Sequence, residues 1–293
     1  MLTWQTLDIS EWRTGVDEPR GRRSKWWVIA PDGSDWLRKE PRKLRPYEPP
    51  VEMLMLQLAR EAGLRAAEGI ACQWRDAGQL KRGVVVRLFV NRAREQLASG
   101  AQLLRRHDPD YQPEAKWQHT IARVREVLVQ QEAAGGRNLL LDFAQLIAFD
   151  AWIGNGDRHQ GNWSVIIPED GSGSQLAPMY DPAACLGTEL QDGHRQLDVR
   201  LRTTADLQRY LLRCPSGFGD GTRPVALAQV VDTIREWPEW SENAGSWLAA
   251  FRNALNTLRV FLPSVDSSWL PEHRKIFIAT LLEQRLLWLA RRI

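Results

Sequence analysis

Residues 150–163 read Asp-Ala-Trp-Ile-Gly-Asn-Gly-Asp-Arg-His-Gln-Gly-Asn-Trp, and residues 179–182 read Met-Tyr-Asp-Pro. These stretches hold Asp157, then Asn162 five positions later, then Asp181 behind a short expected hairpin. Phosphoryl transfer from ATP needs one carboxylate to position the attacking hydroxyl. It also needs an amide and a second carboxylate to hold magnesium on the phosphates. The spacing of the three residues therefore predicts ATP-dependent phosphoryl transfer.

The residues before Asp157 predict a rigid support for it. A helix over 138–153 is apolar on most of its surface and should be buried. It runs into Gly154-Asn155-Gly156, a turn sequence that would present Asp157 at a loop tip. Asp150 is expected to brace this loop rather than to act in the site. The alternative is a turn whose aspartate makes only structural hydrogen bonds.

Composition argues against a membrane protein, a secreted protein and a nucleic-acid-binding protein. The chain has 293 residues, a formal net charge of +3 and 43% hydrophobic residues, as in ordinary globular proteins. Its basic clusters favour a solvated face, so we expect no direct nucleic-acid binding. No stretch approaches a membrane span, and the N-terminus does not read as a signal peptide. Three scattered cysteines suit a reducing compartment, so a cytoplasmic location is expected.

The pattern along the chain predicts an α+β protein with two lobes. Residues 1–90 are strand-rich: a hairpin over 26–40 turns at Asp-Gly, a helix covers 51–62, and strands cover 69–75 and 83–90. Residues 91–293 are mainly helical. Helices are expected near 116–133, 138–153, 203–213, 224–236, 243–261 and 271–292, with strands at 163–167 and 176–180. A small strand-rich N-lobe (1–90) and a larger helical C-lobe (91–293) give a bilobal, protein-kinase-like fold.

The catalytic stretch, with the Ala-Pro-Met-Tyr-Asp-Pro segment behind it, resembles the HipA-like serine/threonine kinases. The resemblance is sharp over 140–188, weaker over 20–90 and poor in the last hundred residues. It implies that Asp157 is the catalytic aspartate, that His159 lies near the transferred phosphate, and that Asn162 and Asp181 are magnesium ligands. The order Asp-Arg-His is shared with phosphoinositide lipid kinases and differs from ordinary protein kinases.

The resemblance also implies a lysine in the small lobe that binds the ATP phosphates. Lys39 stands at the end of the second hairpin strand, where the family has this lysine. A surface lysine at a strand end is the alternative. Arg38 should point to the opposite face, because side chains alternate along a strand. Glu52 is the expected partner of Lys39, although an acid near a helix N-terminus is also favourable by itself.

The segment from Gly15 to Lys25 is expected to cover the phosphates. It carries no G-x-x-x-x-G-K-[ST] sequence, which disfavours a P-loop nucleotidase. Relatives have a serine-bearing loop here that can be autophosphorylated, and Ser24 is the first candidate, ahead of Ser10. Ser24 and Lys25 would then contribute to nucleotide binding. An exposed basic loop is the alternative reading.

Two further expectations concern loops. By analogy with the kinase fold, the backbone groups of Leu88 and Val90 should contact the adenine edge. His194 is expected to be an exposed loop histidine. Metal chelation by histidines and cysteines is disfavoured, because they lack ligand spacing.

The leading hypothesis is an ATP- and magnesium-dependent serine/threonine protein kinase. The resemblance implies a short form without the family's extra N-terminal subdomain. A partner chain, such as an antitoxin, could supply the missing part. It also implies a toxin-like kinase that acts on a translation component, and a capacity for autophosphorylation. One alternative is a lipid or small-molecule kinase with the same catalytic loop. The other is a nucleotide-binding pseudokinase that serves as an interaction module.

Overall fold

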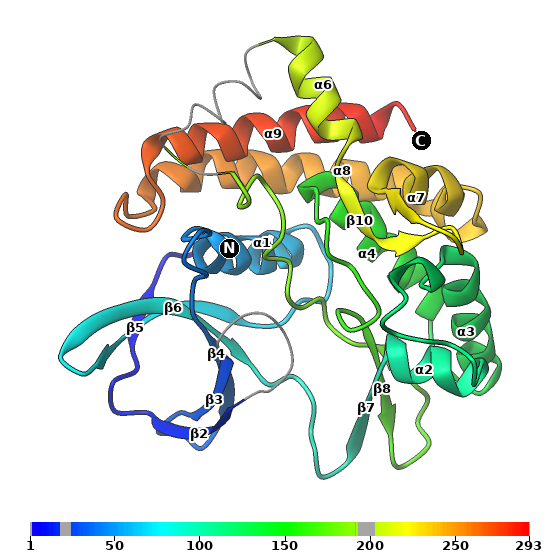
Figure 1. The fold of residues 1–293 in the computed structure, drawn as a ribbon, viewed down its shortest axis with the longest axis horizontal. Coiled ribbons are helices and arrows are strands. Elements are labelled where there is room, and N and C mark those ends of the chain that lie inside the picture. Colours follow the sequence, from blue (N-terminus) through cyan, green and yellow to red (C-terminus); the bar gives the residue numbers. More distant parts are fainter. Residues whose placement is uncertain (1, 18–24, 191, 193–202, 293) are drawn as a thin grey trace.

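The computed structural model describes residues 2–17, 25–190, 192 and 203–292. Ser24 and His194 lie outside the described residues. The fold is α+β, as predicted: a curled, strand-rich sheet lies on one side and helices lie on the other (Figure 1).

The N-terminal sheet is built on the predicted hairpin. Strands β3 (Lys25–Ile29) and β4 (Asp35–Lys39) pair antiparallel, and Gly33 takes a positive φ of 84° in the turn between them. Strand β6 (Gln79–Arg87) pairs with β4 and with β5 (Gly69–Asp76). The described strands of this sheet follow the order β1-β5-β6-β4-β3-β2, in which β1 (Thr6–Asp8) and β2 (Arg13–Asp17) form the edges.

Helix α1 (Glu48–Glu61) joins this sheet to the helical part. It begins three residues before the predicted start, because Pro49 and Pro50 are tolerated in a first helical turn. Most of its residues are buried, and it packs on β5, β6 and the long helix α8 (Pro238–Phe261). Glu52 lies in this helix and is 0% exposed.

The helical part surrounds α4 (Leu139–Ile153). This helix is apolar on nearly all sides and packs against α3 (Ile121–Ala133), α7 (Leu227–Ile234), α8 and α9 (Glu272–Ala290). Helices α2 (Gly100–His107) and α6 (Thr204–Leu212) complete the described helices. In Figure 1, α8 and α9 lie side by side across one side of the molecule, and they are in contact.

Short strands complete the framework. Strands β7 (Glu95–Ser99), β8 (Ser164–Pro168) and β9 (Gln175–Leu176) form an antiparallel sheet. Strands β10 (Pro215–Gly219) and β11 (Pro224–Ala226) form a hairpin.

Several predicted boundaries were wrong. The first three residues of the expected helix 224–236 are strand β11. The expected helix 116–133 is divided in two. A 3-10 turn covers Lys116–Gln118, and α3 begins at Ile121, with Thr120 as its N-terminal cap. The strand expected at 83–90 ends at Arg87, and the strand expected at 176–180 is only β9.

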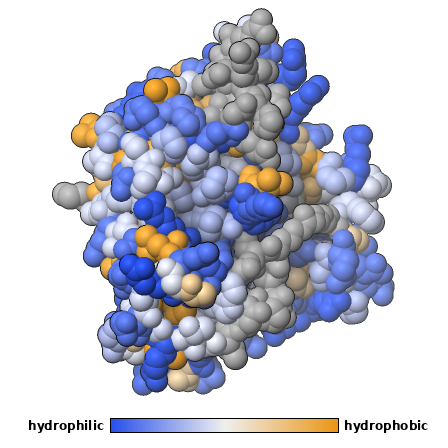
Figure 2. All heavy atoms as spheres, turned by 60° about the vertical axis from the view of Figure 1, so that its left-hand side comes forward, coloured by the Kyte–Doolittle hydropathy of each residue, from blue (hydrophilic) through white to orange (hydrophobic). Residues whose placement is uncertain are grey.

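The interior is one large hydrophobic cluster with a smaller one in the outer sheet. The large cluster includes side chains from α1, α4, α8 and α9, so it runs from the sheet into the helical part. Cys72, Cys185 and Cys214 are buried free thiols. On the face shown in Figure 2, hydrophobic residues form separate patches among hydrophilic ones. Among the described residues, no helix is both long and apolar enough to span a membrane.

Candidate active site

A buried ion pair supports the loop that carries Asp157. Helix α4 ends at Gly154, which takes a left-handed φ of 67°. Arg158 Nε donates to Asp150 Oδ2 at 2.7 Å, and Arg158 Nη2 donates to Asp150 Oδ1 at 2.9 Å. Both side chains are buried, and Asn155 Nδ2 also donates to Asp150 Oδ1 at 2.8 Å. Asp150 therefore braces the loop, as expected, and Asp157 stands exposed at its tip.

The same arginine links the three residues of the sequence motif. Arg158 Nη1 donates to the carbonyls of Asn162 and Tyr180. Asn162 Nδ2 donates to the carbonyl of Asp157 at 2.7 Å. Burial is the largest single effect on the pKa of Arg158 and lowers it, but Asp150, with smaller contributions from Tyr180 and Asp181, raises this pKa overall. A permanently charged guanidinium thus holds Asp157, Asn162 and the segment before Asp181 together.

Asn162 and Asp181 offer oxygen atoms of the kind that magnesium prefers. Because Asn162 donates through Nδ2, its Oδ1 is the atom left for a cation. Asp181 has a φ of 54°, a left-handed conformation that is rare outside glycine and is often found at functional sites. Among the described residues, no group of three or more histidine, cysteine, aspartate or glutamate side chains could hold a metal ion. A cation here would therefore also need oxygen ligands from water or from a bound molecule.

The N-terminal sheet brings the ammonium groups of lysine side chains against the carboxylate of Asp181. Lys39 is 3% exposed and forms an ion pair with Glu52 of α1. Its Nζ also lies 3.0 Å from Asp181 Oδ1. The alternative of a surface lysine at a strand end is wrong, because Lys39 is buried. Arg38 points to the other face, where its guanidinium lies over the rings of Trp26 and Trp74.

Lys25 reaches the same aspartate from the neighbouring strand. Its Nζ lies 3.3 Å from Asp181 Oδ2. Lys25 and Lys39 are register partners across β3 and β4. Two like charges directly opposite each other in a sheet repel, and here Asp181 lies against both.

The remaining predicted residues occupy loops near this cluster. His159 is half-buried, and its Nδ1 accepts a hydrogen bond from the Gly161 N–H at 2.9 Å. The N–H of Leu88 donates to the carbonyl of Asp35 at 2.9 Å, so this donor is not available to an adenine ring. The carbonyl of Leu88 and the backbone of Val90 remain candidates. Phe89, between them, stacks on Tyr180 at 5.6 Å between ring centroids.

His119 is a structural residue that the sequence did not reveal. It is fully buried, and its ring stacks on Phe218 of β10 at 4.4 Å between centroids. The Trp163 indole can only donate, so the 3.1 Å contact makes His119 Nε2 an acceptor. Nδ1 then carries the proton and donates to the Gly217 carbonyl at 2.7 Å. Burial lowers the pKa of His119 to about 4, so the ring is neutral.

Gly217 brings β10 against the loop that carries Asp157. A Cβ atom at this position would lie 2.1 Å from the carbonyl carbon of Arg158 and 2.2 Å from the backbone nitrogen of His159. Only glycine allows this approach. A lone histidine and a glycine in a weak strand pattern gave no signal in the sequence, because both act through tertiary contacts.

The sheet and helix α1 together bury the Lys39–Glu52 ion pair, and Lys39 also contacts Asp181 of the motif. This arrangement is that of a kinase-like fold. A family model, HipA-like C-terminal domain, matches residues 18–238. The chain belongs to this family, as the sequence predicted. No curated protein sequence matches the chain significantly.

Solved structures agree on the fold. The Helicobacter pylori proinflammatory kinase CtkA superposes with a TM-score of 0.74 at 15% identity, covering 96% of this chain and 94% of CtkA. HipA of Shewanella oneidensis MR-1, solved with HipB and operator DNA, gives 0.55 at 14% identity, covering 94% of this chain and 64% of HipA. The Golgi casein kinase with Mn/ADP bound superposes with a TM-score of 0.50 at 15% identity, covering 94% of this chain and 71% of the casein kinase chain. Family and fold together support a kinase function.

Proposed function

We propose that the protein is an ATP- and magnesium-dependent kinase that phosphorylates serine or threonine in a protein substrate. The contact of Lys39 Nζ with Asp181 Oδ1 at 3.0 Å carries this proposal. It joins the buried pair of Lys39 in β4 and Glu52 in α1 to Asp181, the last residue of the motif. That arrangement suits a nucleotide held between the sheet and the loop.

Each residue then has a distinct role. Asp157, exposed at the loop tip, accepts or orients the substrate hydroxyl. Lys39, oriented by Glu52, binds the α- and β-phosphates, and Lys25 adds a second cation beside them. Asn162 and Asp181 would hold magnesium, which offsets the charge of the phosphates when bound. His159 lies in the same loop, near the expected position of the transferred phosphate.

The relatives support the finer parts of the proposal. The Golgi casein kinase structure holds manganese and ADP, which supports a nucleotide and a divalent cation here. HipA was solved as part of a toxin–antitoxin system with HipB, which supports a regulatory partner chain and a toxin-like role. We place the lobe boundary near residue 91 and the protein in the cytoplasm. Autophosphorylation of Ser24 stays a prediction.

Labelling with radioactive ATP and magnesium in a bacterial lysate tests this function. We expect the wild type to label protein on serine or threonine, and Asp157→Asn to label it about 10²–10⁴-fold more slowly. Asp110→Asn removes an exposed acid far along the chain from the motif and should label like the wild type.

The other outcomes separate the alternatives. Label in lipid or small molecules, with none in protein, would show the lipid or small-molecule kinase. Nucleotide binding without any labelled product would show the pseudokinase. Identification of the labelled species by mass spectrometry would name the acceptor.

A further inference from the structure

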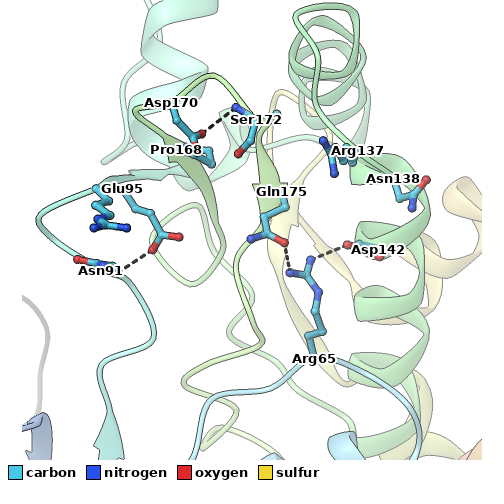
Figure 3. A pocket seen from close by; sticks show the side chains of 12 residues that line it. Arg65, Asn91, Glu95, Arg137, Asn138, Asp142, Pro168, Asp170, Ser172 and Gln175 are labelled. Atoms are coloured by element: carbon cyan, nitrogen blue, oxygen red, sulfur yellow. Dashed lines mark hydrogen bonds and ion pairs between the residues drawn. The ribbon is translucent and has the colours of Figure 1, made fainter.

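A polar hollow of about 650 Å³ has a lining that includes none of Lys25, Lys39 and Asp181, and Figure 3 shows the side chains that line it. It is lined by the chain before β7, the turn between β8 and β9, and the beginning of α4. Three arginines face it: Arg65, which follows α1, Arg94 and Arg137. Its volume falls in the range of small-molecule sites, roughly 300–1,000 Å³.

The acidic side chains of the hollow already have partners. Asp142 Oδ2 accepts from Arg65 Nη2 at 2.7 Å, as Figure 3 shows. Glu95 accepts from the Asn91 N–H at 2.7 Å. Asp170 accepts from the N–H of Ser172 at 2.9 Å within its own turn. Of these three carboxylates only Asp142 is paired with a cation in the described part of the chain, whereas Glu95 and Asp170 accept hydrogen bonds from backbone N–H groups.

The three arginines differ in whether their guanidinium groups have hydrogen-bond partners. Arg65 is held by Asp142, by Gln175 Oε1 at 2.8 Å and by the carbonyl of Leu176 at 2.7 Å. Arg94 and Arg137 are exposed, and within residues 2–17, 25–190, 192 and 203–292 neither guanidinium has a hydrogen bond or ion pair. Two guanidinium groups thus remain as donors around the hollow.

We propose that this hollow binds a small ligand with two anionic groups, phosphate or carboxylate, held by Arg94 and Arg137. A guanidinium matches both oxyanions with paired, charge-assisted hydrogen bonds. This ligand site does not depend on the proposed kinase function.

The elements that line the hollow also lead along the chain to the residues of the candidate active site. It lies at the start of α4 and at the β8–β9 turn. The other end of α4 leads to Asp157, β8 follows Asn162, and the chain after β9 leads to Asp181. The carbonyl of Arg65 accepts from the N–H of Met179, two residues before Asp181, at 2.8 Å. A ligand here would contact the distal ends of the elements that carry the motif.

Isothermal titration of the full chain with inorganic pyrophosphate, without magnesium and at low salt, tests the site. We expect the wild type to bind and Arg94→Gln/Arg137→Gln to bind at least about tenfold more weakly. Arg252→Gln/Arg291→Gln removes the same charge from exposed positions elsewhere and should bind like the wild type. The thermal midpoint of each variant without ligand verifies that it is folded.

Two results would overturn the proposal: no binding by the wild type, or equal weakening in both double variants. Unchanged pyrophosphate binding in Arg94→Gln/Arg137→Gln would also overturn it, by placing the anion elsewhere. Arg137→Glu gives a second check, because reversal of this charge should weaken pyrophosphate binding more than the single neutral change Arg137→Gln does. Failure of lysate labelling with intact pyrophosphate binding would reject the kinase function alone.

Discussion

Lys39 and Glu52 show how a single ion pair can be both structural and functional. Both side chains are almost completely buried, and they come from a strand and a helix thirteen positions apart. A buried charge that loses its partner is costly, whereas removing both charges often costs little. This asymmetry allows the stability role of the pair to be separated from its proposed role in ATP binding.

Lys39→Met should lower the free energy of unfolding by about 3–5 kcal/mol, because Glu52 loses its buried lysine. Lys39→Met/Glu52→Gln should regain much of this loss, yet ATP binding should be lost in both variants. Urea unfolding and nucleotide titration measure the two effects. A double variant no more stable than Lys39→Met would contradict the buried-charge argument.

His119 should make stability depend on pH. Its pKa is lowered to about 4 in the fold, against about 6.5 in the unfolded chain, so the unfolded chain binds the proton more readily. The stabilisation is complete above about pH 6.5 and is lost as pH falls toward 4. Between pH 7 and pH 4 we expect the wild type to lose about 3 kcal/mol more than His119→Gln.

Urea unfolding of both proteins across this pH range measures the difference. Carboxylates titrate in both proteins and cancel in the comparison. Parallel stability curves for the wild type and His119→Gln would show that His119 is not held neutral by its surroundings.

At the scale of elements, the β10–β11 hairpin packs against the loop that carries Asp157. Gly217 lies against the backbone of Arg158 and His159, and the backbone of Gly219 is bonded to His119. The contact is backbone on backbone, so a side chain cannot swing aside to make room. The hairpin and loop therefore have to fit each other closely.

Gly217→Ala should displace the loop, reduce ATP-dependent labelling strongly and destabilise the protein by about 1–3 kcal/mol. Gly245→Ala is the matched control, because nothing lies within 4 Å of the added Cβ in α8. It should stabilise the protein by about 0.5–1 kcal/mol. Equal activity in the two variants would contradict the importance of this contact.

The elements differ in how well the sequence predicted them. The β3–β4 hairpin and α4 were predicted because an Asp-Gly turn and a long apolar helix leave clear local patterns. Strands β1, β7 and β10 were missed, since each has only three to five residues and mixed polarity. Their pairing depends on partners far along the chain: β7, for example, pairs with β8.

At the scale of the whole molecule, the large hydrophobic cluster crosses from the sheet to the helical part through α1. The motif residues Asp157, Asn162 and Asp181 could be identified from the sequence because they lie close together along the chain. The roles of Lys25 and Arg158 as links between distant segments could not, because those contacts join residues up to 156 positions apart. The two lobes predicted from the pattern thus share one core.

A shared core predicts cooperative unfolding. Leu58 of α1 is 0% exposed, so Leu58→Ala should cost about 2–5 kcal/mol. The urea midpoints measured by tryptophan fluorescence and by far-UV circular dichroism should coincide in the wild type and shift together in the variant. Two separated transitions would show instead that the sheet and the helical part unfold independently.

The contact of Lys25 and Lys39 with Asp181 has a consequence for inactivating variants. Asp181→Asn would leave two ammonium groups facing each other across β3 and β4 without the carboxylate that now lies against both. Such a protein would lose the proposed magnesium ligand and would also bind free polyphosphates more tightly than the wild type does. An apparently inactive Asp181→Asn protein could therefore sequester nucleotide tightly, whereas Asp157→Asn would leave the charge around both lysines unchanged.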